Sequence, residues 1–142
     1  MRNLLILVIL STSLFLFSQC DSVPTAGVLE GENFDYSLVE KAIGIKRTLD
    51  GAGASEGWEY FYFCDRTKGA NKKKCGKWVD EKGNKVKIGS NVTLKGNSAI
   101  ISIVSEKESG RYVAILENPK DESYGLVLYV GATPPPPPPP TN

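Results

Sequence analysis

Two cysteines and the lysine run between them are the residues of this 142-residue chain most suited to chemistry. Cys64 and Cys75 enclose the ten residues DRTKGANKKK, whose glycine, asparagine and lysines are typical of a hairpin tip. Cysteines at the foot of a hairpin can reach the Cα separation of about 5.5 Å that a disulfide requires. A redox pair or a metal site would need closer spacing or further ligands. The spacing therefore predicts a disulfide between Cys64 and Cys75.

The segment inside this loop, residues 65–74, is strongly cationic. It contains the run Lys72–Lys74, preceded by Arg66 and Lys68. An anionic glycan or an acidic partner could dock on such a concentration of positive charge. The alternative is a solvated loop tip whose charge prevents edge-to-edge pairing of strands.

The composition argues against an enzyme. The chain has no histidine, which removes the Ser-His-Asp and Cys-His mechanisms and zinc sites built from cysteine and histidine. Asp121 and Glu122 are adjacent acids in an expected turn, where solvated turn residues are the usual explanation. The glycine-rich stretch GAGASEG lacks the strand-then-helix setting of a phosphate-binding loop. The sequence predicts no catalytic residue, no metal and no cofactor.

Residues 1–20 have the features of a secretory signal peptide: a basic start at Arg2, a short apolar run, and small residues before a break after Cys20. The apolar run, residues 4–17, is shorter than the roughly 20 residues of a membrane span. A bacterial lipoprotein signal with Cys20 acylated is the alternative, although Gln19 stands where that signal prefers a small residue. Secretion to the extracellular space is the expectation.

The chain without its leader is formally neutral. The leader carries one of the 17 basic residues and none of the 16 acids, so 16 of each remain. A neutral chain does not favour a general polyanion binder such as a nucleic-acid protein. Cleavage of the leader also removes one of the three cysteines. Cys64 and Cys75 remain, an even pair suited to an oxidising compartment.

Residues 21–131 are expected to form one all-β domain, because short strand-like runs alternate with Gly, Asn, Asp and Lys clusters. Residues 40–57 are expected to be a long connection, which could hold a helical turn near 41–46. Residues 132–142 form a proline-rich tail whose seven prolines favour a polyproline II rod. The expected strands are 28–29, 33–39, 58–64, 77–80, 92–95, 99–104, 111–117 and 124–130.

The run ESGRYVA supplies the strongest motif. Glu108, Gly110 and Tyr112 resemble the Asp-x-Gly-x-Tyr-x-Cys run at the E–F corner of the immunoglobulin superfamily. Ala99, Ile101 and Val104 occupy the apolar positions of the preceding strand, and Gly31, Glu32, Phe34 and Tyr36 resemble the passage into strand B. The resemblance implies an antiparallel immunoglobulin-like β-sandwich, of an I-set or V-set type, with a tyrosine corner in which the Tyr112 hydroxyl bonds the backbone at the bend.

The inter-sheet disulfide of that family is missing. Leu38 and Ala114 stand at its two cysteine positions, and together they could fill about the space of a cystine. The resemblance also implies a tryptophan in strand C. Both Trp58 and Trp78 are candidates, and Trp58 would require an enlarged B–C connection.

Strand alternation predicts an interaction face. If Tyr112 and Ala114 point inward, the side chains between and around them point outward. With residues 58–64 taken as strand C, the resemblance makes the C, F and G strands neighbours and merges their outer sides into one apolar, aromatic patch. The alternative is that the B–C connection or the amino-terminal lead-in covers this patch. The face residues are Trp58, Tyr60, Tyr62, Arg111, Val113 and Ile115.

The sequence as a whole predicts a secreted binding or adhesion module that recognises an extracellular or cell-surface protein, including a second copy of itself. Asn91 begins an N-x-Thr sequon, so glycosylation is expected there in a eukaryotic source. An effector or inhibitor acting through residues 65–74 and a bacterial envelope lipoprotein are the alternatives.

Overall fold

The structure is a computed structural model, which describes residues 22–51, 57–103, 105–121, 123 and 125–132. The predicted signal peptide, the prolines 134–140 and the positions Val104 and Glu122 lie outside the described residues. The strands and short 3-10 helices are β1 (Thr25–Leu29), β2 (Asn33–Ser37), β3 (Ala42–Leu49), β4 (Glu59–Tyr62), η1 (Gly69–Lys74), β5 (Trp78–Val79), β6 (Asn91–Lys95), β7 (Ser98–Ser102), η2 (Glu106–Glu108), β8 (Gly110–Leu116) and β9 (Gly125–Gly131).

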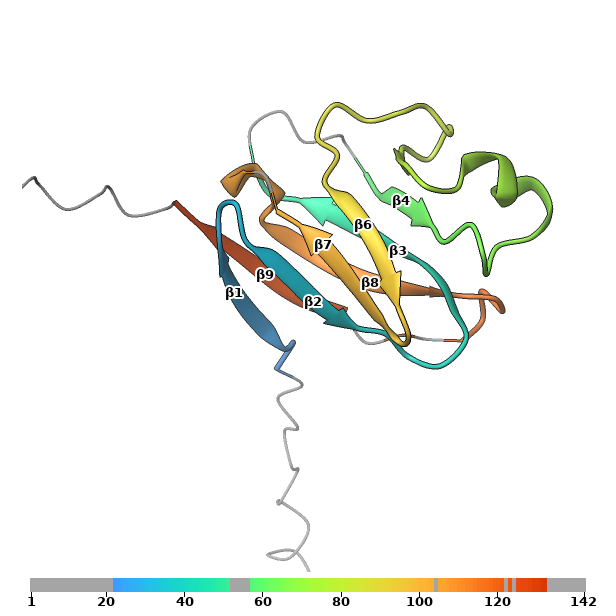
Figure 1. Cartoon of the computed structure of the whole chain (residues 1–142), viewed down its shortest axis with the longest axis horizontal. Helices are drawn as coiled ribbons and strands as arrows, with labels where there is room; N and C mark the ends of the chain where they lie inside the picture. Colours follow the sequence, from blue (N-terminus) through green and yellow to red (C-terminus); the bar gives the residue numbers. More distant parts are fainter. Residues whose placement is uncertain (1–21, 52–56, 104, 122, 124, 133–142) are drawn as a thin grey trace, which may run out of the picture.

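Two sheets face each other across one core (Figure 1). The larger sheet has the order β1-β9-β8-β3-β4-β5, and the smaller has the order β2-β7-β6. Every pairing is antiparallel except that of β1 with β9. Strands that are adjacent in space but distant in sequence, such as β2 with β7, give the Greek-key arrangement of an immunoglobulin-like β-sandwich. The predicted fold class is confirmed.

The core is apolar where the family would place its cystine. Leu38 and Ala114 are both buried in a single hydrophobic cluster with Tyr36, Ile101 and Leu128. Tyr36 comes from β2, Ile101 from β7 and Leu128 from β9, so side chains of both sheets meet in this cluster. Burial of these side chains holds the two sheets together, at about 1.5–3 kcal/mol for each fully buried large apolar side chain.

The helical turn predicted near residues 41–46 is wrong. These residues enter β3, which pairs with β8 on one side and β4 on the other. Gly44 allows the close approach of β4, because a Cβ there would overlap the Phe61 carbonyl oxygen. The register shifts between Ala42 and Gly44. The start of β3 therefore lacks the regular alternation from which a strand is predicted in a sequence.

The position of β3 also corrects the strand assignment of the aromatic run. Strand β4 does not pair with β8, because β3 lies between them. Neither tryptophan lies in β3: Trp58 immediately precedes β4, and Trp78 begins β5. Trp78 is buried and Trp58 is half-buried, so the core tryptophan enters from a strand near the sheet edge.

The disulfide between Cys64 and Cys75 is confirmed, with a Cα–Cα separation of 5.0 Å. The loop that it closes contains η1 and packs onto the sandwich instead of projecting as a free tip. The Thr67 hydroxyl donates to the Ile43 carbonyl at 3.0 Å, and the Arg66 guanidinium donates to the Gly96 carbonyl at 2.8 Å. The basic loop is therefore held in one position.

Replacing both cysteines by alanine is expected to lower the free energy of unfolding by about 2–3 kcal/mol, because a closed loop of this length restricts the unfolded chain. Urea denaturation of the parent and the variant measures the loss. The parent under reducing conditions is the control and should lose the same amount. An unchanged denaturation midpoint would mean that the bond does not constrain the unfolded chain.

Candidate functional site

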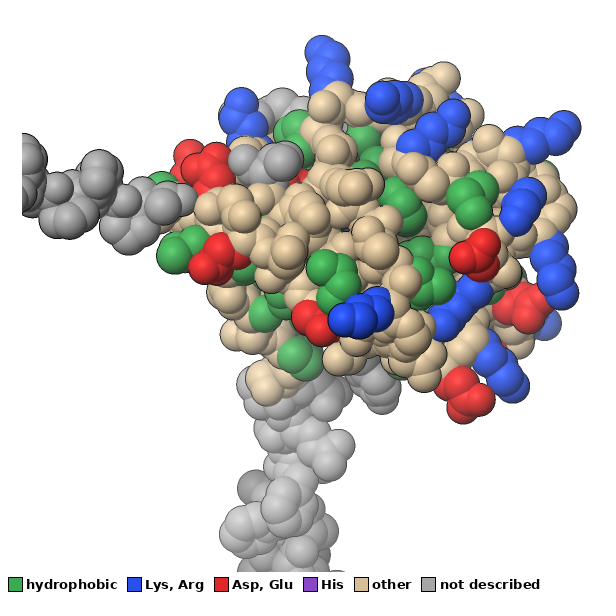
Figure 2. All heavy atoms as spheres, in the orientation of Figure 1, with side chains coloured by type: hydrophobic (Ala, Val, Ile, Leu, Met, Phe, Trp, Pro, Cys, Tyr) green, Lys and Arg blue, Asp and Glu red, His purple; other side chains and the backbone are tan. Residues whose placement is uncertain are grey.

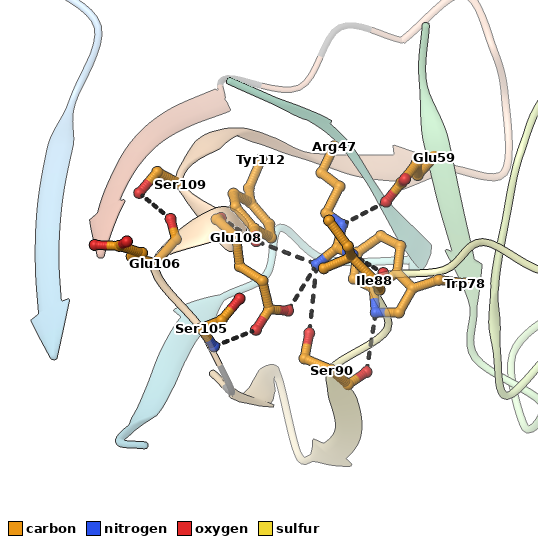
Figure 3. Close-up of polar contacts among 10 residues, drawn as sticks. All are labelled: Arg47, Glu59, Trp78, Ile88, Ser90, Ser105, Glu106, Glu108, Ser109 and Tyr112. Atoms are coloured by element: carbon orange, nitrogen blue, oxygen red, sulfur yellow. Dashed lines mark hydrogen bonds and ion pairs between the residues drawn. The ribbon is translucent and has the colours of Figure 1, made fainter. Parts of the chain in front are cut away.

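A buried guanidinium is the centre of an extended polar network (Figure 3). The Arg47 side chain on β3 is 0% exposed. Its Nε donates to Glu59 Oε2 at 2.9 Å, its Nη1 to Glu108 Oε1 at 3.1 Å, and its Nη2 to the Ile88 carbonyl at 2.6 Å. Both carboxylates are themselves buried. Arg47 thus joins β3 to β4, to η2 and to the segment before β6.

The same network contains the tyrosine of the E–F corner. The Tyr112 hydroxyl donates to the Glu108 carbonyl at 2.8 Å, across four residues of chain. The hydroxyl lies 3.3 Å from Arg47 Nη1. Burial raises the pKa of Tyr112 to about 12, so the hydroxyl stays protonated and able to donate. Glu108 also closes a capping box with Ser105 at the start of η2.

Gly110 is required by the close approach of β3 to β8 at the corner. A Cβ at this position would overlap the Thr48 carbonyl oxygen and come within 2.9 Å of Leu49 Cα. The three residues of the motif therefore make different contacts. Glu108 binds Arg47, Gly110 allows the backbone of β3 to approach, and the Tyr112 hydroxyl donates to the backbone at the bend.

Trp78 completes this network from the edge of the sheet. The Arg47 guanidinium carbon lies 3.9 Å from the Trp78 ring centroid, and the ring packs edge-on against Tyr112. The indole Nε1 donates to the Ser90 carbonyl at 3.0 Å. The network is closed to solvent and its described hydrogen-bonding groups are paired. It stabilises the sandwich by joining the larger sheet to η2 and to the segment before β6.

The outer side of the larger sheet carries a hollow of about 510 Å³. Five of the six predicted face residues line it, namely all except Tyr62. Lys46 belongs to β3, the strand between β4 and β8. Its Nζ lies 4.6 Å from the Trp58 ring centroid. The β8–β9 loop forms one wall. The lining residues are Lys46, Trp58, Tyr60, Arg111, Val113, Ala114, Ile115, Leu116, Asn118, Pro119, Asp121 and Ser123.

Tyr62 lies beside this hollow, in contact with Tyr60, which lines it. The Tyr60 and Tyr62 rings stack with centroids 6.2 Å apart and planes 8° apart. Tyr62 and Tyr60 also line a second hollow of about 470 Å³ with Lys74, Val79, Asp80 and Glu81. The six predicted residues therefore occupy one continuous side of the sheet, which we call the outer face.

The outer face is less open than the alternation predicts. Arg111 is exposed and Ile115 is half-buried, but Val113 is only 7% exposed. Val113 lies between Lys46 of β3 and Gly125 of β9 in the register of the sheet, and a Cβ on Gly125 would come within 2.7 Å of its side chain. A charge placed at Val113 would therefore test folding, whereas a charge placed at Ile115 would test binding.

The remaining predicted positions lie apart from the outer face or at its margin. Asn91 is the first residue of β6 and is exposed, as a glycosylation site must be. Asp121 stands in the β8–β9 loop at the wall of the hollow. Within the described ranges, no three His, Cys, Asp or Glu side chains gather closely enough to hold a metal ion, and no helix there is long and apolar enough to cross a membrane.

Comparison with known proteins gives a likeness of fold only. No family model matches the sequence, and no curated protein matches it. Among solved structures, the chain is similar to the extracellular domain of the voltage-gated sodium channel beta4 subunit, described as a parallel homodimer that explains a role in cell-cell adhesion. The identity is 15%, the match covers 78% of this chain and 92% of that one, and the TM-score is 0.39. The sheet order and the strand register define the fold of this chain.

Proposed function

We propose that this chain is a secreted recognition module: a single immunoglobulin-like domain, of the variable type, that binds an extracellular or cell-surface protein and has no catalytic role. The observation that carries the proposal is the outer face, where Trp58, Tyr60 and Arg111 converge on one hollow with Ile115. The variable type is favoured because β4 and β5 extend the larger sheet beyond β3.

The chemistry of the outer face fits a protein partner. Tryptophan, tyrosine and arginine are the residues enriched where protein interfaces concentrate their binding energy. Here the aromatic rings are already ordered by stacking and by the Lys46 contact, so binding would lose little side-chain entropy. Lys46 and Arg111 line the same hollow as Asp121, and this combination of charges favours a partner with mixed charge.

Secretion is supported by the leader at residues 1–20 and by the Cys64–Cys75 disulfide, since such bonds persist mainly in oxidising compartments. The exposed Asn91 sequon is compatible with the same route. The absence of histidine from the sequence is the ground for proposing no enzymatic role. The proposed protein partners include a second copy of this chain.

Replacing Ile115 by glutamate is expected to weaken binding through the outer face at least tenfold while the free energy of unfolding falls by no more than about 1 kcal/mol. Self-association is measured by analytical ultracentrifugation, and binding to cell-surface proteins by capture with the labelled domain. Ser37→Glu, which adds the same charge on exposed β2 of the other sheet, is the matched control. Equal binding by parent, variant and control would refute the proposed surface.

A further inference from the structure

The formally neutral chain has its charges divided between two parts. Residues 65–90 contain nine basic residues and three acids, a net charge of +6. The rest of the chain beyond the leader contains the remaining seven basic residues and 13 acids, a net charge of −6. Over half of the basic residues thus fall within 26 consecutive positions. The neutrality of the whole conceals a strongly cationic segment.

The cationic segment forms one body in space, although it spans two loops. Both loops lie together beyond β4 and β6 (Figure 1), and Lys and Arg side chains line the same margin of the molecule (Figure 2). Lys74 of η1 packs against Gly83 of the β5–β6 loop, where a Cβ would come within 3.1 Å of its Cε. Val79 pairs with Lys85 in a β-bridge. We call residues 65–90 the cationic end.

The positive charges of the cationic end are available to a ligand. Both ion pairs among the described residues belong to Arg47. Of the nearby acids, Asp80 already accepts hydrogen bonds from Asn84, at 2.8 Å from the backbone nitrogen and 3.1 Å from the side chain. Lys72 donates to the Cys64 carbonyl, which fixes its position without neutralising it. The exposed lysines of this end are Lys68, Lys72, Lys73, Lys77, Lys82, Lys85 and Lys87.

A hollow of about 200 Å³ lies between two of these lysines. Among its lining residues, Lys77, Lys85 and Asn91 are exposed, whereas Phe61, Trp78 and Ser90 are buried. The buried rings offer no stacking surface, so this hollow can present charge, and not an aromatic face, to an anionic ligand.

We propose that the cationic end binds a sulfated polysaccharide, whose sulfates pair with Lys77, Lys85 and the surrounding exposed lysines. The polymer releases condensed counterions as its charges pair with lysine, which is the source of affinity for any polyanion. The disulfide and the packed loop hold the lysines in place before binding, so little order is lost on association.

A protein or a membrane fits the cationic end less well. The described large hydrophobic residues that are exposed, Val23, Leu29, Val39 and Tyr129, all lie outside residues 65–90. A protein interface needs an apolar centre within its polar rim, and a membrane-binding surface inserts apolar side chains between lipid headgroups. An ionic polymer needs only accessible charges at suitable spacing.

The test titrates the full secreted chain with heparin by calorimetry at several NaCl concentrations. We expect binding that weakens steeply with salt and is lost with desulfated heparin. The combined variant K77Q, K82Q and K85Q should bind at least tenfold more weakly, with a shallower dependence on salt. The matched control is K95Q, K107Q and K120Q, which removes the same charge from exposed positions outside the cationic end and should retain affinity within about twofold.

Three results would overturn the proposal: no heparin binding at low salt, equal weakening in the test and control variants, or binding to phosphatidylserine vesicles or a duplex DNA as tight as binding to heparin. The proposed protein-binding surface is tested separately, because Ile115→Glu lies on the outer face and should leave heparin affinity unchanged. Loss of heparin binding in that variant would also contradict the assignment to the cationic end.

Discussion

Replacing Arg47 by methionine is expected to lower the free energy of unfolding by about 3–5 kcal/mol. The substitution removes a fully buried cation that bonds Glu59 and Glu108. Two buried carboxylates then lose the charge that offsets their desolvation, and the Ile88 carbonyl loses its 2.6 Å donor. Methionine fills the space of the aliphatic stem and leaves that of the guanidinium, so the loss contains a volume part as well as a charge part. Urea denaturation followed by circular dichroism measures it.

A compensated variant separates charge from packing. Adding Glu59→Gln to Arg47→Met neutralises one of the stranded carboxylates, so the double variant should be more stable than Arg47→Met alone. Arg47→Lys keeps the charge but loses the forked geometry that reaches both acids, and it should fall between parent and Arg47→Met. A double variant no more stable than the single one would show that the carboxylates do not depend on Arg47.

Trp78→Ala is expected to cost about 3–5 kcal/mol, the range for removing a buried aromatic side chain. The ring contacts Phe61 at a centroid distance of 5.5 Å, and the Arg47 guanidinium stacks on it. Its loss leaves a cavity and removes the donor to the Ser90 carbonyl. Thermal and urea denaturation give the loss, and the two methods should agree on the order of the variants.

Two further tryptophan variants sharpen this prediction. Trp78→Phe keeps a ring in the core but removes the indole N–H, so it should lose about 1–2 kcal/mol. Trp58→Ala is the matched control, because Trp58 is half-buried on the outer face and outside the core cluster, and it should lose less than Trp78→Ala. Similar losses at both positions would contradict the assignment of Trp78 as the core tryptophan.

The elements that sequence reasoning could predict are those specified by local pattern. The run from β7 through η2 to β8 has its apolar positions, its glycine and its tyrosine at short fixed spacings. The disulfide likewise depends on two residues separated by one loop. Strand β3 is different, because Arg47 is polar and yet buried. Its partners Glu59 and Glu108 stand 12 and 61 residues away, so no local window could identify it as an inward-facing residue.

The outer face shows how a wrong strand assignment can still gather residues that share one side of the sheet. Alternation fixes which side of a sheet a side chain occupies, whatever strand lies beside it. Tyr60 and Arg111 therefore share the outer side although β3 separates their strands. What alternation could not supply is the intervening Lys46, or the burial of Val113, since both depend on the neighbours of each strand.

The parallel pairing of β1 with β9 determines how the domain would respond to a pulling force. Force applied to the two ends of the chain loads the register from Thr25↔Val127 to Leu29↔Gly131 along the strand direction. All of these rungs must then yield together, which is a mechanically strong geometry. The disulfide encloses only residues 64–75 and joins no strand of one sheet to the other. Once the terminal strands part, nearly the whole domain can be drawn out to its contour length, because the disulfide keeps only residues 64–75 closed.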